Sequence, residues 1–191
     1  MTYCVAIQLD EGLVFCSDSR TNAGADRVST YSKMHRFSVA NDRSLYLLTS
    51  GNLATSQAVI STLSERNKAA NDRKPSILEA PSMFQVARIV SQTLAEVIGI
   101  TSPDEQASES TFSATFILGG QAKGGDMRLY LIYPEGNFIE VSEENPFFQI
   151  GETKYGRPIL VRAFDPEMSV EAATKLLMVS FDSTIKANLS V

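Results

Sequence analysis

The sequence predicts an α+β fold in which two antiparallel sheets are stacked face to face and helices cover their outer faces. Two observations support this prediction. The predicted elements follow the order strands, two helices, strands, two helices. The chain has 191 residues, of which 43% are hydrophobic and 20% charged. This is enough for one domain, residues 1–191, to bury a layered core without a disulfide or a metal.

The first predicted elements are strands. Two form a hairpin around a short turn at 10–12, and two more follow a polar segment at 20–32. The four strands are predicted over 2–9, 13–19, 33–39 and 44–50. Four antiparallel strands are therefore expected before any helix.

The next elements are two amphipathic helices and a second group of strands. The helices are predicted over 53–66, with Asn52 as N-cap, and over 82–98, with Gly99 as the stop. Both carry apolar stripes and can pack on one sheet face. An acidic loop is expected at 101–110. The second group of strands is predicted over 111–118, 127–133 and 137–141, with turns at Gly119-Gly120 and Pro134-Glu135-Gly136.

The last predicted elements are a short strand over 147–150 and two helices over 157–164 and 169–183. Pro158 lies in the first turn of the first of these helices, where its missing N–H has no helical acceptor to bond. The apolar residues of the second helix lie on one face, as expected of a helix packed on a core.

Composition excludes several classes of function. The net charge of −5 argues against a nucleic-acid or anionic-membrane surface. With no long apolar run and no signal-peptide pattern, the protein is expected in the cytoplasm. Cys4 and Cys16 lack disulfide or zinc spacing and are predicted to be buried free thiols. His35 has no ligand partners at a suitable spacing, so no metal or organic cofactor is expected.

The first candidate site residue is Thr2, directly after Met1. A strand-like apolar run begins here, so the terminus is expected to be held in a sheet. The small Thr2 side chain should permit removal of Met1, which would place the hydroxyl beside a free α-amine. That amine can act as the base, so the single histidine of the chain is not needed. The alternative is that Thr2 is merely a tolerated second residue.

Asp18, Lys33 and Gly51 complete the candidate site. Thr2, Asp18 and Lys33 fall at successive strand ends, which an antiparallel meander can bring to one sheet end. The Lys33 ammonium would favour negative charge on the Thr2 oxygen and lower the pKa of the terminal amine. Asp18 would hold Lys33 in place, and N–H groups at Gly51 could bind an oxyanion. The alternatives are a surface carboxylate, an exposed edge lysine and a simple strand-to-helix turn.

Together these residues resemble the proteasome β-subunit family. The resemblance is carried by Thr2 with its strand, Lys33, and the stretches 16–20 and 49–53, and it extends over 150–156 and 182–190. The bacterial ancestral-β-subunit group is the most similar. The resemblance implies the N-terminal-nucleophile (Ntn) hydrolase fold, a four-layer αββα sandwich, and assembly of identical subunits into a ring or open ring. It makes Thr2 the nucleophile and base, Asp18 and Lys33 its electrostatic partners, and Gly51 the oxyanion donor.

Two positions depart from the family pattern. The family usually has serine after the glycine of the late strand-to-helix turn, where this chain has Glu152. The family also has an Asp-x-x-Ser-Gly motif beyond the last long helix. Here either Ser190 matches the serine and Asp182 substitutes for the aspartate, or Asn188 and Val191 hold the two places.

Three functions are consistent with these features. The first is a threonine-nucleophile hydrolase that cleaves a peptide or other amide. The second is a ring-forming scaffold subunit that cleaves little, which Glu152 and the altered end motif would allow. The third is an Ntn amidase acting on small amides rather than proteins. The sequence identifies no ATPase partner.

Overall fold

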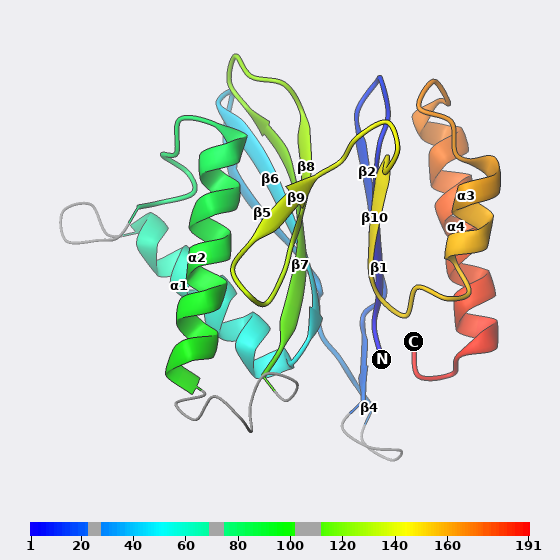
Figure 1. Cartoon of the computed structure of the whole chain (residues 1–191), viewed down its shortest axis with the longest axis horizontal. Coiled ribbons are helices and arrows are strands. Elements are labelled where there is room, and N and C mark those ends of the chain that lie inside the picture. Colours follow the sequence, from blue (N-terminus) through cyan, green and yellow to red (C-terminus); the bar gives the residue numbers. More distant parts are fainter. Residues whose placement is uncertain (23–27, 69–74, 102–111) are drawn as a thin grey trace.

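The computed structural model describes residues 1–22, 28–68, 75–101 and 112–191. Four layers are stacked in the order helices, five-stranded sheet, three-stranded sheet, helices (Figure 1). The first helical layer contains α1 (Leu53–Lys68) and α2 (Met83–Thr101), and the last contains α3 (Arg157–Ala163) and α4 (Val170–Ala187). The predicted α+β architecture with two stacked antiparallel sheets is confirmed. The predicted acidic loop falls mostly on 102–111, outside the described residues.

The three-stranded sheet holds the N-terminus at its centre. Its order is β10 (Phe147–Gly151), β1 (Tyr3–Gln8) and β2 (Leu13–Ser17), all antiparallel. The expected hairpin is present, because the Leu9 N–H donates to the Gly12 carbonyl at 2.8 Å. Alternate residues of β1 serve two cores. Tyr3, Val5 and Ile7 point to one face and pack toward α3 and α4. Cys4 and Ala6 point to the opposite face and pack toward the other sheet.

The five-stranded sheet corrects the predicted meander. Its order is β5 (Met34–Val39), β6 (Arg43–Gly51), β7 (Ala114–Ala122), β8 (Arg128–Ile132) and β9 (Phe138–Glu140). The first four predicted strands are therefore divided between two facing sheets. The polar segment 20–32 also forms two short strands, β3 (Arg20–Asn22) and β4 (Val28–Thr30), which pair with each other. Polar three-residue strands have no apolar alternation, so the sequence pattern did not reveal them.

The predicted turn at Gly119-Gly120 is wrong. Both glycines lie inside β7, opposite Tyr46 and Leu45, and the turn comes later, where the Gly125 N–H donates to the Ala122 carbonyl at 3.0 Å. A Cβ on Gly119 would lie 2.6 Å from the Phe15 ring, on the facing sheet. Glycine here allows the two sheets to approach each other closely.

Of the two predicted helix caps, Asn52 is confirmed and Gly99 is wrong. Asn52 accepts from the Thr55 N–H at 3.0 Å and caps α1 as predicted. Gly99 does not end its helix, since α2 continues to Thr101. Ser169 caps α4, which runs to Ala187, past the predicted end at 183.

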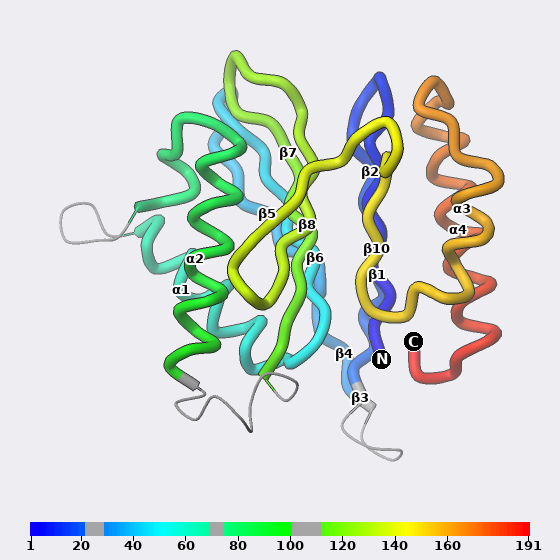
Figure 2. Tube along the Cα trace, viewed as in Figure 1, coloured from blue at the N-terminus to red at the C-terminus, as the bar shows by residue number. Residues whose placement is uncertain are grey.

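The two ends of the chain lie beside each other. Figure 2 shows the chain leaving α4 and turning back toward the start of β1. Val191 is buried in the same apolar cluster as Tyr3, between the three-stranded sheet and the last helical layer. The C-terminal turn therefore lies next to the candidate nucleophile.

Candidate active site

Thr2 lies just before β1, and the backbone from its carbonyl group onward is hydrogen bonded. Its carbonyl oxygen accepts from the Glu152 N–H at 2.6 Å. The following Tyr3 N–H donates to Asp18 Oδ1 at 2.8 Å, and the Tyr3 carbonyl accepts from the Asp18 N–H at 3.1 Å. Thr2 itself is half-buried, and Met1 is exposed. The terminus is thus held in the sheet, as predicted.

Tyr3 anchors this terminus in the core. Its ring is fully buried and lies against Phe181 of α4, with ring centroids 4.5 Å apart. Its hydroxyl lies 2.7 Å from Ser180 Oγ and accepts from Gln149 Nε2 at 2.6 Å. No sequence pattern indicates this role, because the partners of Tyr3 lie far away along the chain and form no motif with it.

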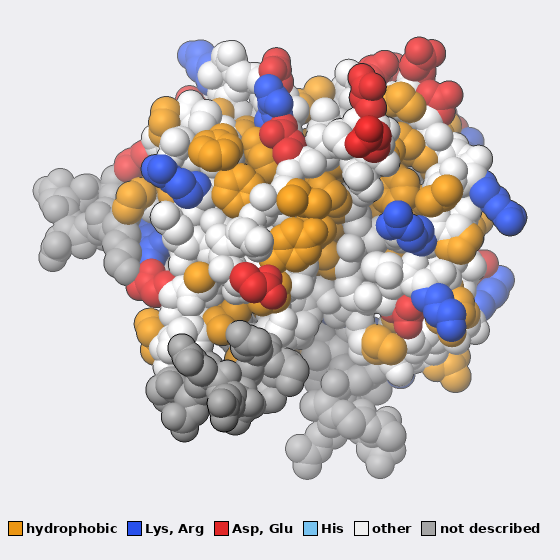
Figure 3. Space-filling view, viewed as in Figure 1, with side chains coloured by type: hydrophobic (Ala, Val, Ile, Leu, Met, Phe, Trp, Pro, Cys, Tyr) orange, Lys and Arg blue, Asp and Glu red, His pale blue; other side chains and the backbone are white. Residues whose placement is uncertain are grey.

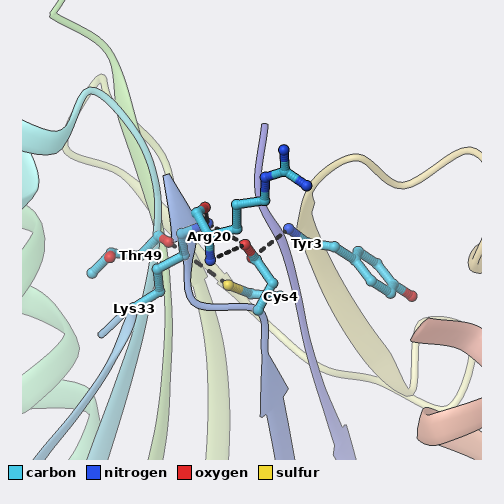
Figure 4. A network of polar contacts seen from close by, with 6 residues as sticks. Tyr3, Cys4, Arg20, Lys33 and Thr49 are labelled. Carbon is cyan, nitrogen blue, oxygen red and sulfur yellow. Dashed lines mark hydrogen bonds and ion pairs between the residues drawn. The ribbon is translucent and has the colours of Figure 1, made fainter. Parts of the chain in front are cut away.

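Asp18 and Lys33 form a buried ion pair. Asp18 Oδ2 accepts from Lys33 Nζ, and the side chains are only 6% and 7% exposed, respectively. Lys33 Nζ also donates to the Arg20 carbonyl at 2.5 Å, and Asp18 Oδ2 accepts from the Arg20 N–H at 3.1 Å (Figure 4). The expected alternatives, a surface carboxylate and an exposed edge lysine, do not fit this burial.

The ion pair joins the two sheets. Asp18 follows β2 of the three-stranded sheet, whereas Lys33 precedes β5 of the five-stranded sheet. The Lys33 carbonyl accepts from the Thr49 N–H at 2.9 Å, which extends the β5–β6 pairing to Lys33. The convergence of Thr2, Asp18 and Lys33 expected from the sequence is therefore present, but it arises across the sheet interface and not within one meander.

Gly51 ends β6 beside this cluster. The φ of Gly51 is 102°, which favours glycine. A Cβ at this position would also lie only 2.4 Å from the Ser113 carbonyl oxygen. The Oγ of the preceding Ser50 lies 3.2 Å from where a Cβ on Gly151 would stand, and the Thr2 carbonyl oxygen lies 2.0 Å from that point. The end of β6 is thus next to Thr2. Ser50 was not singled out in the sequence analysis.

The three supporting residues named from the sequence have different positions. Glu152 contacts the Thr2 carbonyl through its N–H, and its carboxylate accepts from Asn188 Nδ2 at 2.9 Å. The Ser190 N–H donates to Asn188 Oδ1 at 3.0 Å. Asp182 instead pairs with Lys186 on the exposed face of α4. The polar connection between the C-terminal turn and Thr2 therefore runs through Asn188.

The surroundings of the terminus favour a neutral amine. Burial, and next the Lys33 ammonium, lower the pKa of the Met1 amine below its usual 8.0, while Asp18 acts in the opposite direction. The two cysteines are free thiols, as predicted, with Cys4 buried and Cys16 partly exposed. Burial raises the pKa of the Cys4 thiol, so Cys4 is not a reactive thiolate.

Other kinds of site receive no support in the described parts of the chain. There, no three histidine, cysteine or carboxylate residues are grouped as metal ligands. No helix among the described residues has the length and apolar character needed to cross a membrane. Acidic and basic side chains are interspersed over the face in Figure 3, without the continuous basic surface that nucleic acid requires.

The chain belongs to the proteasome-subunit family, because the family model matches residues 2–190. This agrees with the four layers and with the position of Thr2 at the head of a central strand. The expected Ntn-hydrolase fold is confirmed. No significant match is found among curated proteins.

Within the family, the chain is similar to solved structures of Anbu, an ancestral β-subunit. Anbu from Yersinia bercovieri has 42% identity and a TM-score of 0.92, and the match covers 100% of this chain and 77% of that one. Anbu from Pseudomonas aeruginosa, solved as a helical assembly, has 46% identity, a TM-score of 0.92 and the same coverage. Anbu from Hyphomicrobium sp. strain MC1 has 45% identity and a TM-score of 0.89, with 100% and 78% covered. The resemblance to the bacterial ancestral-β-subunit group is confirmed.

Proposed function

We propose that this protein is an N-terminal threonine hydrolase that cleaves peptide or other amide bonds once Met1 has been removed. The observation that supports this most is the fixed backbone around Thr2, which lies beside the buried Asp18–Lys33 pair. A nucleophile whose own carbonyl and following amide are held in place needs little reorganisation before attack. Met1 is exposed, so its removal disturbs no core packing.

Bond cleavage proceeds through an acyl ester on Thr2. The α-amine accepts the hydroxyl proton as Oγ1 forms a bond to the substrate carbonyl carbon. The tetrahedral intermediate collapses, the C–N bond breaks, and the ammonium gives its proton to the leaving amine. Water then gives a proton to the amine and attacks the ester, after which the C–Oγ1 bond breaks and the proton returns to Oγ1.

Lys33 and Gly51 stabilise the charges that develop in these steps. The Lys33 ammonium favours negative charge on Oγ1 and keeps the pKa of the amine low, so that the amine is neutral and can accept a proton. The Gly51 N–H, at the exposed end of β6, donates to the oxyanion of the intermediate. Asp18 accepts hydrogen bonds from Lys33 and from the Tyr3 amide and so fixes the position of both, without contacting the substrate.

The hydrolase acts in a self-assembled particle, either a ring or an open ring. Anbu from Pseudomonas aeruginosa forms a helical assembly, which shows that a similar chain associates with itself. In this chain the last helical layer carries exposed apolar side chains that a second copy could cover. They are Val161, Val170, Met178, Val179 and Ile185.

Peptide hydrolysis tests the proposal. Protein lacking Met1 is expected to cleave a panel of fluorogenic peptides or small amides, and Thr2→Ala is expected to be inactive with an unchanged circular dichroism spectrum. Thr2→Ser, which keeps a hydroxyl and an amine, is expected to retain activity. Equal turnover by Thr2→Ala would contradict the proposal. Turnover of small amides but not peptides would indicate an amidase.

One observation favours a second function, a scaffold subunit with little activity. Glu152 occupies the position where the family usually has serine, and its carboxylate is engaged in contacts with Asn188 and the Lys154 N–H. Retention of Met1 in assembled particles purified from cells would favour this function, because Thr2 would then lack a free amine.

A further inference from the structure

The loop after β10 connects the candidate nucleophile to the C-terminal turn through Glu152. Its N–H donates to the Thr2 carbonyl oxygen at 2.6 Å. Its Oε2 accepts from Asn188 Nδ2 at 2.9 Å, and its Oε1 accepts from the Lys154 N–H at 3.1 Å. The backbone and both carboxylate oxygens of one half-buried residue are thus engaged at the same time.

Asn188 continues this connection to the C-terminal turn. It follows the last residue of α4, and its N–H donates to the Thr184 carbonyl at 2.8 Å. Its side-chain Oδ1 accepts from the Ser190 N–H at 3.0 Å. A series of hydrogen bonds therefore runs from the Thr2 carbonyl through Glu152 and Asn188 to Ser190.

The contact with Thr2 requires a glycine directly before Glu152. Gly151, just before Glu152, has a φ of 86°, and the Thr2 carbonyl oxygen lies 2.0 Å from where its Cβ would stand. Both carboxylate oxygens of Glu152 accept hydrogen bonds from other residues, and it is the backbone N–H of Glu152 that contacts Thr2. Glu152 therefore acts on Thr2 through position.

We propose that Glu152 is a positioning residue that makes the orientation of Thr2 depend on the C-terminal turn. The inference rests on the proposed role of Thr2 as nucleophile. A displaced nucleophile loses rate far more than substrate affinity, because small displacements matter most in the transition state. Glu152 then takes over, through its contacts with Thr2 and Asn188, the place that the family usually gives to serine.

Exchanging the donor and the acceptor of the Glu152–Asn188 contact tests this proposal. In Glu152→Gln, an amide faces the Asn188 amide, so the side chain cannot accept from both Asn188 Nδ2 and the Lys154 N–H with good geometry. In Asn188→Asp, two carboxylates face each other and repel. In the double variant, Gln at 152 donates to Asp at 188 while its oxygen still accepts from the Lys154 N–H. Each single variant is expected to lower kcat about tenfold or more with little change in KM. The double variant is expected to recover most of the activity of the parent, because the exchange restores the number of hydrogen bonds between the two side chains.

The pH profile provides a second signature. In Asn188→Asp, the loss should decrease as the pH falls, because a proton shared between two facing carboxylates restores the hydrogen bond. Asp182→Asn is the matched control, since Asp182 lies on α4, shortly before Asn188, but forms a solvent-exposed ion pair with Lys186. Asp182→Asn should behave like the parent protein.

Hydrogen exchange separates this inference from the proposed catalysis. The Glu152 amide is expected to be protected in the parent and double variant and to exchange faster in both single variants. If the parent hydrolyses nothing, the catalytic proposal fails, but exchange still reports whether the contact holds the Thr2 carbonyl. Unchanged exchange and kcat in the single variants would overturn the inference, as would a double variant as impaired as the single variants combined.

Discussion

Removing the charge of Asp18 is expected to destabilise the fold strongly. Asp18→Asn would leave the Lys33 ammonium, only 7% exposed, without a counter-charge. Breaking a buried ion pair by removing one partner costs about 3–5 kcal/mol. For a chain of this length each kcal/mol lowers Tm by about 2–4 °C, so Tm should fall by roughly 6–20 °C.

The assay is thermal unfolding followed by circular dichroism, at one protomer concentration because self-association would shift Tm. Asp18→Asn/Lys33→Met should be less destabilised than Asp18→Asn alone, because no charge remains buried and Asn at 18 can still accept from the Tyr3 N–H. Asp182→Asn breaks an exposed pair and should change Tm by less than about 2–4 °C. A similarly small change in Asp18→Asn would refute the assigned burial of the pair.

Three further predictions concern the terminus and the end of β6. Burial and the Lys33 charge lower the pKa of the Met1 amine, and the same surroundings are expected to act on the Thr2 amine after processing. Because the base must be neutral, activity of processed protein should rise with pH through a midpoint below the ordinary pKa of an α-amine. Lys33→Met should move that midpoint to higher pH in a pH–rate profile. Gly51→Ala should lose soluble folded protein or activity, since its Cβ has no room, whereas Gly12→Ala, with open space, should be tolerated in the same expression and activity assays. Tyr3→Phe should lower the free energy of unfolding by about 1–3 kcal/mol in urea titrations, because the buried Ser180 and the half-buried Gln149 both lose the hydroxyl they bond to.

Local signals predicted the elements, and strand ends predicted much of the site. The 10–12 turn and the Asn52 cap are correct because short-range turn and cap chemistry determines them. Thr2, Asp18 and Lys33 were grouped because each lies at a strand end. Asp18 does contact both Lys33 and the amide that follows Thr2. The assumed meander is wrong, since strand length and polarity do not indicate which sheet a strand joins.

Long-range contacts left no pattern in the sequence. Gly119 is typical of a turn, but it lies inside β7 because Phe15 of the facing sheet occupies the space of its Cβ. The contact of Glu152 with Asn188 likewise joins residues at no motif spacing. Asp182 was a candidate for the site by its position in the chain, but the geometry of α4 directs it to solvent.

The role of Thr2 as nucleophile is tested most directly by the intact mass of purified protein before and after incubation with a threonine-directed β-lactone. The purified protein is expected to lack the mass of Met1 and then to form one adduct that is absent in Thr2→Ala. Processed protein with a free Thr2 that forms no adduct, or an adduct that persists in Thr2→Ala, would contradict the role of Thr2 as the nucleophile.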